Sequence, residues 1–259
     1  MPLIKTFQEI NAMREGGALL ARALQQAVNA VRPGVTVQEL DRIAEEAILQ
    51  GGGTPSFKGY KGGGKIPFPS TMCISVNHEV VHGLGTRDLV LKEGDIVGLD
   101  IGCWFKKLCT DMAVTVPVGK ISAERLKLLR ITRHAMYAGV DAAEVGKTTH
   151  DMAAAIEGQV PKGYGIVKSL VGHGVGHAVH EAPHVPNFVS KSFPKVVLKT
   201  GMCLAIEPMI TMGTDDVALA SDGWTIVTAD GSDAAHFEVT IVFGEEGTEI
   251  VTPQPEIGI

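Results

Sequence analysis

An aspartate inside an apolar, strand-like run limits what this chain can fold into. The run Ile96–Ile101 reads Ile-Val-Gly-Leu-Asp-Ile, so Asp100 is flanked by residues that favour a buried strand. An unpaired, ionised carboxylate in such a place costs several kcal/mol. The folded chain must therefore supply a partner for Asp100.

A second aspartate follows at a spacing that suits a hairpin. Asp111 comes eleven residues after Asp100. If the chain folds back with its turn near Phe105-Lys106, the two aspartates become direct cross-strand neighbours, about 5 Å apart. A lone aspartate in a strand more often pairs with a lysine or caps a turn, but two like charges so placed repel unless a cation lies between them. The pair therefore favours a bound cation.

Two glutamates occur in the same apolar setting. Glu207 ends the run that begins at Met202, and Glu238 directly precedes the run Val239–Phe243. A second metal ion needs carboxylates that bridge it to the first. Four carboxylates on strand-like runs therefore predict a site for two cations.

Histidines gather in a glycine-rich segment between residues 172 and 184. Imidazole is a common metal ligand and proton carrier, and glycines let the backbone approach a site closely. At least one of the four histidines is expected to be structural, with His177 and His184 preferred for that role over the other two, His173 and His180.

Three short motifs point to other functions but lack the right context. His78–His82 matches HExxH, the zinc-protease helix motif, yet the surrounding valines and isoleucines favour a strand. Gly59–Lys65 matches GxxxxGK, but Ile66 replaces the magnesium-binding Ser or Thr, so a loose loop is expected over Lys61–Lys65. The glycines at 172, 174 and 176 do not form the dinucleotide-binding GxGxxG.

Helical periodicity and capping signals recur in the same order twice. Thr36 and Thr148 lie 112 residues apart in matching contexts, which suggests two similar halves that close on one shared site. The sequence predicts four helices, over Thr6–Val31, Thr36–Gly51, Ser122–Val140 and Thr148–Ile156. It predicts strands over Ile96–Ile101, Ala113–Val118, Met202–Ile206 and Val239–Phe243. An α+β chain with a single domain over residues 1–259 is expected.

Composition excludes several classes of function. The chain has 23 Lys+Arg against 29 Asp+Glu, a balance that disfavours DNA or an anionic membrane as partner. Its four cysteines form no CxxC pair and are expected to be free thiols in a reducing compartment. No apolar run approaches the roughly 20 residues that a bilayer span needs, and the N-terminus does not look like a secretion signal. A cytoplasmic protein is expected.

Five motifs occur together in the order and spacing of one known family. They are Asn77–Gly83, the pair of Asp100 and Asp111, Gly172–Glu181, Ile206–Met209 and Phe237–Glu238. Together they resemble the type I methionine aminopeptidases, over nearly the whole chain. The resemblance implies a pita-bread fold, in which two pseudo-symmetric halves form a central antiparallel sheet covered by helices. It also implies an enzyme that removes the initiator methionine from nascent proteins and peptides near the ribosome and prefers a small second residue. A monomer is expected.

The resemblance also implies a role for each ligand. One of two divalent ions (cobalt, manganese, iron or zinc) would be held by Asp111, His173, Glu207 and Glu238, and the other by Asp100 together with the two bridging residues, Asp111 and Glu238. Glu207 would accept a proton from the water that lies between the ions.

Substrate contacts follow from the same resemblance. His180 would contact the scissile carbonyl and its developing oxyanion, and His82 would hydrogen-bond to the substrate nearby. The methionine side chain would lie against Tyr60, Cys73 and Trp224. This chain departs from the family pattern around that side chain, with Val179 in place of an aromatic, Val239 where histidine is frequent, and a longer stretch over Lys61–Phe68.

Two alternatives share the fold. Xaa-Pro aminopeptidases and prolidases have the same five ligands but usually an additional N-terminal domain, whereas here Asp100 follows only two predicted helices and a loop. A non-catalytic pita-bread binding module would have a broken ligand set, and the set in this chain is intact.

Overall fold

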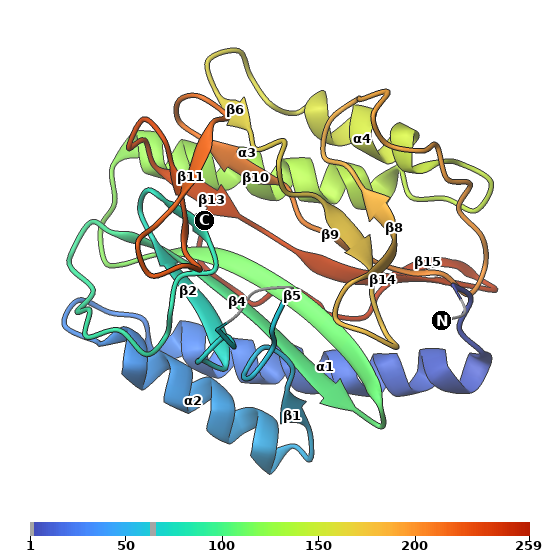
Figure 1. The fold of residues 1–259 in the computed structure, drawn as a ribbon, viewed down its shortest axis with the longest axis horizontal. Coiled ribbons are helices and arrows are strands. Elements are labelled where there is room, and N and C mark those ends of the chain that lie inside the picture. Colours follow the sequence, from blue (N-terminus) through green and yellow to red (C-terminus); the bar gives the residue numbers. More distant parts are fainter. Residues whose placement is uncertain (1–2, 63–65) are drawn as a thin grey trace.

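Each half of the chain opens with a long helix followed by a shorter one. In a computed structural model that describes residues 3–62 and 66–259, α1 (Phe7–Ala30) and α2 (Val37–Gln50) precede the first strands, and α3 (Ala123–Asp141) and α4 (Thr149–Glu157) precede the later ones. The first pair lies on one side of the strands and the second pair on the other side (Figure 1). All four predicted helices are confirmed. Of the loop predicted over Lys61–Lys65, residues 63–65 lie outside the described residues.

The helices begin at the capping residues that the sequence predicts. Thr6 and Thr148 each form a full capping box with the acidic residue three positions later. The Thr36 hydroxyl accepts a hydrogen bond from the Glu39 backbone N–H, at 3.1 Å, without the reciprocal side-chain bond. Each cap satisfies backbone N–H groups that have no partner within the helix.

A ten-residue hairpin forms the centre of the first half. Strands β4 (Ile96–Phe105) and β5 (Leu108–Pro117) are joined by Lys106 and Lys107, which have φ values of 49° and 71°. Positive φ at both residues is the backbone geometry of a tight two-residue hairpin turn. β4 also pairs with β1 (Thr54–Pro55) and β2 (Met72–Val76).

The predicted register of this hairpin is wrong by two residues. Asp100 lies opposite Ala113, and Asp111 lies opposite Gly102. The turn falls one residue later than predicted, and that shifts the pairing by two positions. Because side chains alternate with a period of two, both aspartates still face the same side of the sheet, as diagonal rather than direct neighbours.

The second half forms a five-stranded antiparallel sheet. Its order is β15 (Gly247–Ile250), β14 (Val239–Gly244), β9 (Cys203–Ile206), β7 (Gly172–Gly174) and β8 (Glu181–Val185). An isolated bridge between Ala113 and Glu238 connects it to the hairpin of the first half, with N–H···O distances of 3.2 and 2.9 Å. The four predicted strands correspond to β4, β5, β9 and β14, but β5 ends one residue earlier and β9 begins one residue later than predicted.

Two three-stranded sheets complete the fold. One consists of β3 (Glu79–Val81), β12 (Ile226–Thr228) and β11 (Val217–Leu219), and the other of β6 (Gly165–Ile166), β10 (Met209–Thr211) and β13 (Ala234–His236). Within the described part of the chain, no helix is long and apolar enough to cross a membrane.

Matching backbone contacts relate the two halves. Thr36 forms a bridge with Val90, and Thr148 forms a bridge with Val197; in each case the second residue comes six positions before a central strand. The flanking hydrogen bonds also correspond, because Gly34 donates to the Leu91 carbonyl and Gly146 donates to that of Leu198. The repeated order of elements in the sequence is therefore a repeat in the structure.

Gly17 offers a test of how α1 packs. A Cβ at this position would lie 2.1 Å from the Val251 carbonyl oxygen. We expect Gly17→Ala to lower the free energy of unfolding by about 1–3 kcal/mol, although alanine inside a helix normally gains about 1 kcal/mol over glycine. Urea denaturation measures the change.

Gly98→Ala is the matched control, because its Cβ would meet no atom closer than 3.6 Å. Equal stabilities of the two variants would contradict the packing of α1 against residue 251.

Candidate metal centre

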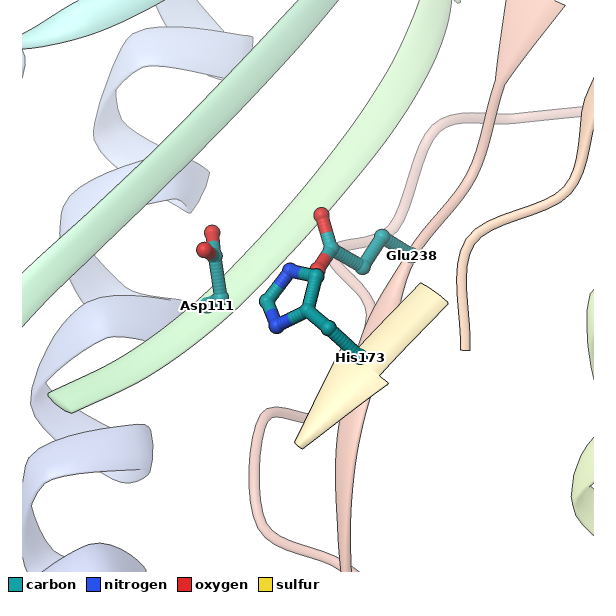
Figure 2. Close-up of side chains that lie close together, drawn as sticks. All are labelled: Asp111, His173 and Glu238. Atoms are coloured by element: carbon teal, nitrogen blue, oxygen red, sulfur yellow. The ribbon is translucent and has the colours of Figure 1, made fainter. Parts of the chain in front are cut away.

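Side chains from both halves converge where the two main sheets meet. Asp100 and Asp111 come from β4 and β5, His173 from β7, Glu207 from the end of β9 and Glu238 from the start of β14. Ligand atoms of Asp111, His173 and Glu238 all lie within 4.8 Å of one another. Figure 2 shows these three side chains pointing toward a common space from three separate elements. The structure thus brings together the residues that the sequence analysis selected as ligands.

The neighbouring polar side chains hold the backbone of the site and leave the carboxylates free. The Thr240 hydroxyl accepts from the Asp111 N–H at 3.0 Å and donates to the Asp111 carbonyl at 2.7 Å. The Gln254 amide donates to the carbonyls of Ala113 and Glu238, at 2.9 and 2.6 Å. These contacts fix the bridge between the halves.

His173 is oriented as a metal-ligating histidine requires. Its Nδ1 lies 2.9 Å from the Gly174 carbonyl oxygen, so Nδ1 carries the proton and donates, and the Nε2 lone pair faces the site. Nε2 lies 3.2 Å from Glu207 Oε1. Burial alone would lower the pKa of His173, but the Glu207 carboxylate raises it above its usual value. A proton or a metal ion is needed between these two atoms.

The carboxylates of Asp111 and Glu238 are buried, and that of Asp100 is half-buried beside them. Burial, followed by the charge of Glu207, raises the pKa of Asp100 to about 8. Burial and the neighbouring carboxylates also raise the pKa values of Asp111 and Glu238 well above their usual range. Among the described residues, one oxygen each of Asp100, Asp111 and Glu238 has no hydrogen-bond partner. This set of oxygen donors and one imidazole fits a divalent cation, which would satisfy those oxygens.

His236 belongs to the site but is not among the site residues predicted from the sequence. Its buried Nε2 lies 3.8 Å from Glu207 Oε2 and 3.9 Å from Glu238 Oε2, and has no hydrogen bond within the described chain. Burial lowers the pKa of His236 to about 3, so the ring is neutral. The available signal was its position two residues before Glu238, because alternate residues of an extended segment share a face.

A cavity of about 590 Å³ opens beside the ligands. Its walls include all five residues that the sequence analysis selected as substrate contacts: Tyr60, Cys73, His82, His180 and Trp224. Phe57 and Phe68 add to the apolar part of the wall. A small apolar group can therefore lie next to the cluster of carboxylates.

Neutral imidazoles border the polar part of the cavity. Burial lowers the pKa of His82 to about 4. Burial, with a smaller effect of His173 and His82, lowers the pKa of His180 to about 3. The Tyr60 hydroxyl lies 2.7 Å from Nδ1 of His180. A neutral imidazole has one N–H to donate, which suits contact with a carbonyl oxygen.

The loop that carries His180 is anchored by a buried ion pair. Lys5 Nζ lies 3.0 Å from Glu181 Oε1, and the Lys5 side chain is 1% exposed. The same carboxylate oxygen accepts a hydrogen bond from the His177 backbone N–H at 2.7 Å. Residues next to His180 are therefore tied to the N-terminal segment.

Three further histidines singled out in the sequence lie outside the cluster of proposed ligands. The His177 ring pairs with Glu9 at 2.7 Å, away from the ligands. His184 lies at the cavity wall, exposed, with its ring edge against Phe193. His78 is exposed while His82 lines the cavity, and strand β3 separates them, so the HExxH match does not form a zinc site.

Comparisons with known proteins identify the family of this chain. Residues 11–245 match the family described as metallopeptidase family M24. The methionine aminopeptidase of Clostridium perfringens is 45% identical over 255 residues, which cover 97% of this chain and 99% of that protein. A crystal structure of methionine aminopeptidase from Thermotoga maritima has a TM-score of 0.91 at 40% identity, and the match covers 98% of this chain and 100% of that one.

A proline-directed enzyme shares the fold alone. The prolidase of Pyrococcus furiosus has a TM-score of 0.75 at 20% identity, and the match covers 98% of this chain but 66% of the prolidase. The two matches above that cover nearly all of both chains, at 45% and 40% identity, are to methionine aminopeptidases. This chain therefore belongs to the methionine aminopeptidases of metallopeptidase family M24 and has their pita-bread fold.

Proposed function

We propose that this chain removes N-terminal methionine from peptides and nascent proteins with the help of two divalent metal ions. The observation that carries the proposal is a cluster of buried carboxylates and one imidazole at the wall of a partly apolar cavity. Such ions, when bound, would supply Lewis acidity and would lower the pKa of a bound water. Residues 1–259 act as one catalytic domain in this proposal.

The ligand set divides between the two ions. Asp111, His173, Glu207 and Glu238 would hold one ion, and Asp100 would hold the other together with Asp111 and Glu238, which would be ligands of both ions. The support is that these side chains come from both halves and carry oxygens without a partner in the described residues. Oxygen and imidazole ligands accept cobalt, manganese, iron or zinc.

Glu207 is the proposed proton acceptor. Its Oε1 faces His173 and its Oε2 faces His236, so both oxygens point into the site rather than to solvent. The Asn187 side chain donates to the Glu207 carbonyl at 3.1 Å and fixes this end of β9. Glu207 takes a proton from the attacking water and returns it to the leaving amine.

His180 and His82 are the proposed donors to the substrate. Both line the cavity and both are neutral at physiological pH, so each offers one N–H. His180 donates to the scissile carbonyl oxygen, where negative charge develops, and His82 donates to the substrate near that bond.

The apolar end of the cavity is the proposed methionine site. Tyr60, Cys73 and Trp224 form its wall together with Phe68. The enzyme would act in the cytoplasm as a monomer near the ribosome and prefer a small second residue. These finer points rest on the family resemblance and on the charge balance of the chain.

Metal dependence and substrate choice can be tested together. Protein stripped of metal and then reconstituted should cleave Met-Ala-Ser, and the stripped protein should not. A peptide with proline in the second position after a bulky first residue, Phe-Pro-Ala, should be cleaved much more slowly. Preferential release of phenylalanine from Phe-Pro-Ala would contradict the substrate assignment.

Replacement of the proton acceptor should separate chemistry from binding. We expect Glu207→Gln, saturated with metal, to lower kcat by roughly 10²–10⁴-fold, the usual contribution of a positioned acid or base. The matched control is Glu246→Gln, at an exposed position in the β14–β15 turn. Near-normal kcat in the Glu207 variant, with unchanged metal content, would rule out this role.

The buried carboxylates predict a distinct pH dependence for metal-free protein. A group whose pKa is raised by folding stabilises the protein below its unfolded pKa, and this contribution is lost as pH rises through the folded value. For Asp100 this stabilisation is lost between about pH 4 and about pH 8. The lowered pKa values of His82, His180 and His236 act in the opposite direction, but only below the ordinary histidine value of 6.5.

Between pH 6.5 and 8.5 the lowered histidine pKa values therefore no longer oppose the carboxylates, and the raised pKa of His173 acts in the same direction as theirs. We expect the melting temperature of chelator-treated protein to fall over this range and that of metal-loaded protein to change much less, since metal competes with protons for the same oxygens. Scanning calorimetry at several pH values checks this. Parallel curves for the two forms would contradict it.

A further inference from the structure

The Tyr60 side chain contacts both a histidine and an apolar cluster. Its hydroxyl lies 2.7 Å from Nδ1 of His180, and the two rings are tilted by 55° with their centroids 5.4 Å apart. Its ring belongs to the apolar cluster that contains Phe68, Val179 and Trp224. One side chain thus contacts both the apolar end of the cavity and the histidine at its polar end.

The position of Tyr60 is set by its backbone. Its N–H donates to the Phe57 carbonyl at 2.8 Å, and its own carbonyl accepts from the Phe68 N–H at 2.8 Å. The N–H of Gly59 donates to the Phe68 carbonyl, also at 2.8 Å. A Cβ on Gly62 would lie 3.0 Å from the Tyr60 ring and 3.5 Å from the Trp224 ring, so bare backbone closes over both rings.

We propose that Tyr60 couples recognition of the substrate side chain to catalysis. Its ring forms part of the apolar wall, and its hydroxyl donates to Nδ1 of His180, so that the imidazole proton stays on Nε2 for donation to the scissile carbonyl oxygen. This inference rests on the role proposed above for His180. Tyr60 is a positioning residue in this scheme.

The chemistry of imidazole supports this assignment. A neutral ring carries its proton on one nitrogen, and a donor to Nδ1 selects the form with the proton on Nε2. Within the described residues, the Tyr60 hydroxyl is the one hydrogen-bond partner of the His180 ring. Without that hydroxyl nothing else among these contacts selects the form or the orientation of the ring.

The coupling follows from the position of the Tyr60 ring. A substrate side chain that fills the apolar end of the cavity packs against the Tyr60 ring and keeps the Tyr60 hydroxyl in contact with His180. A shorter side chain leaves the ring free to shift. Energy from side-chain binding is then expressed in kcat rather than in KM, as expected when remote contacts position the reacting groups.

The test compares Tyr60→Phe with the wild-type enzyme, both loaded with zinc, on three peptides. Met-Ala-Ser and norleucine-Ala-Ser carry long side chains, and norvaline-Ala-Ser carries a shorter one. For the long side chains we expect kcat to fall about tenfold in Tyr60→Phe, the effect of one lost hydrogen bond, with KM changed less than about twofold. The ratio of kcat between norleucine and norvaline peptides should fall toward one.

Two further measurements separate positioning from a merely structural role. In a His180→Asn background, Tyr60→Phe should cause no further loss of kcat, since the two residues act as one unit. Nitrogen-15 NMR of labelled histidine should show the Nε2–H form at His180 in the wild type and a mixture of forms in Tyr60→Phe. The control is Tyr164→Phe, a half-buried tyrosine outside the cavity wall, which should leave all values unchanged.

Several outcomes would overturn the inference. A rise in KM alone would make Tyr60 only a wall residue. An equal loss of kcat for long and short side chains would refute the coupling, and additive losses with His180→Asn would refute action through His180. If His180→Asn by itself leaves kcat unchanged, the role proposed for His180 fails as well, and this result is distinguishable from the others.

Discussion

Burial of several carboxylates in one place is the constraint on which the rest of this structure depends. Asp111 and Glu238 are buried and Asp100 is half-buried beside them, and burial together with like charge raises the pKa values of all three. An arrangement of this kind persists only if other parts of the fold stabilise the backbone that carries it. Thr240 and Gln254 do so by bonding to backbone groups, and they leave the carboxylate oxygens available to a cation.

The position of the site follows from the repeat. Each half packs its helices mainly against its own strands, and the bridge between Ala113 and Glu238 joins the central strands of the two halves. Ligands from the hairpin of one half and from the sheet of the other therefore converge only in the complete fold. The smaller sheets carry the remaining polar side chains to the same place, because β3 ends next to His82 and β13 contains His236.

Most of the proposed metal ligands could be predicted from the sequence, because each is marked by the residues next to it in the chain. A carboxylate in an apolar run marks a charge close to the core wherever the run folds, so Asp100, Glu207 and Glu238 stand out in the sequence alone. The register of the hairpin is not predictable in the same way. Its turn residues, Lys106 and Lys107, have positive φ but are not Asn, Asp or Gly, the residue types that usually mark such a turn. Strand β7 has two glycines in three residues, and its conformation comes from pairing with β8 and β9. His236 lacks an apolar run of its own, so its role depends on tertiary contacts.

Two of the places at which this chain departs from the family pattern lie together around the apolar end of the cavity. Val179 is small where the family resemblance leads one to expect an aromatic, but it is buried in one cluster with Phe57 and Phe68. Phe68 packs edge-on against Trp224 with centroids 5.3 Å apart, and the backbone of Gly62 closes over Tyr60 and Trp224. Aromatic volume is thus supplied by the segment that follows Gly59, and that segment also places the Tyr60 hydroxyl on His180. Because one stretch of chain shapes the pocket and orients the histidine, a change in its length or sequence alters side-chain preference and turnover together.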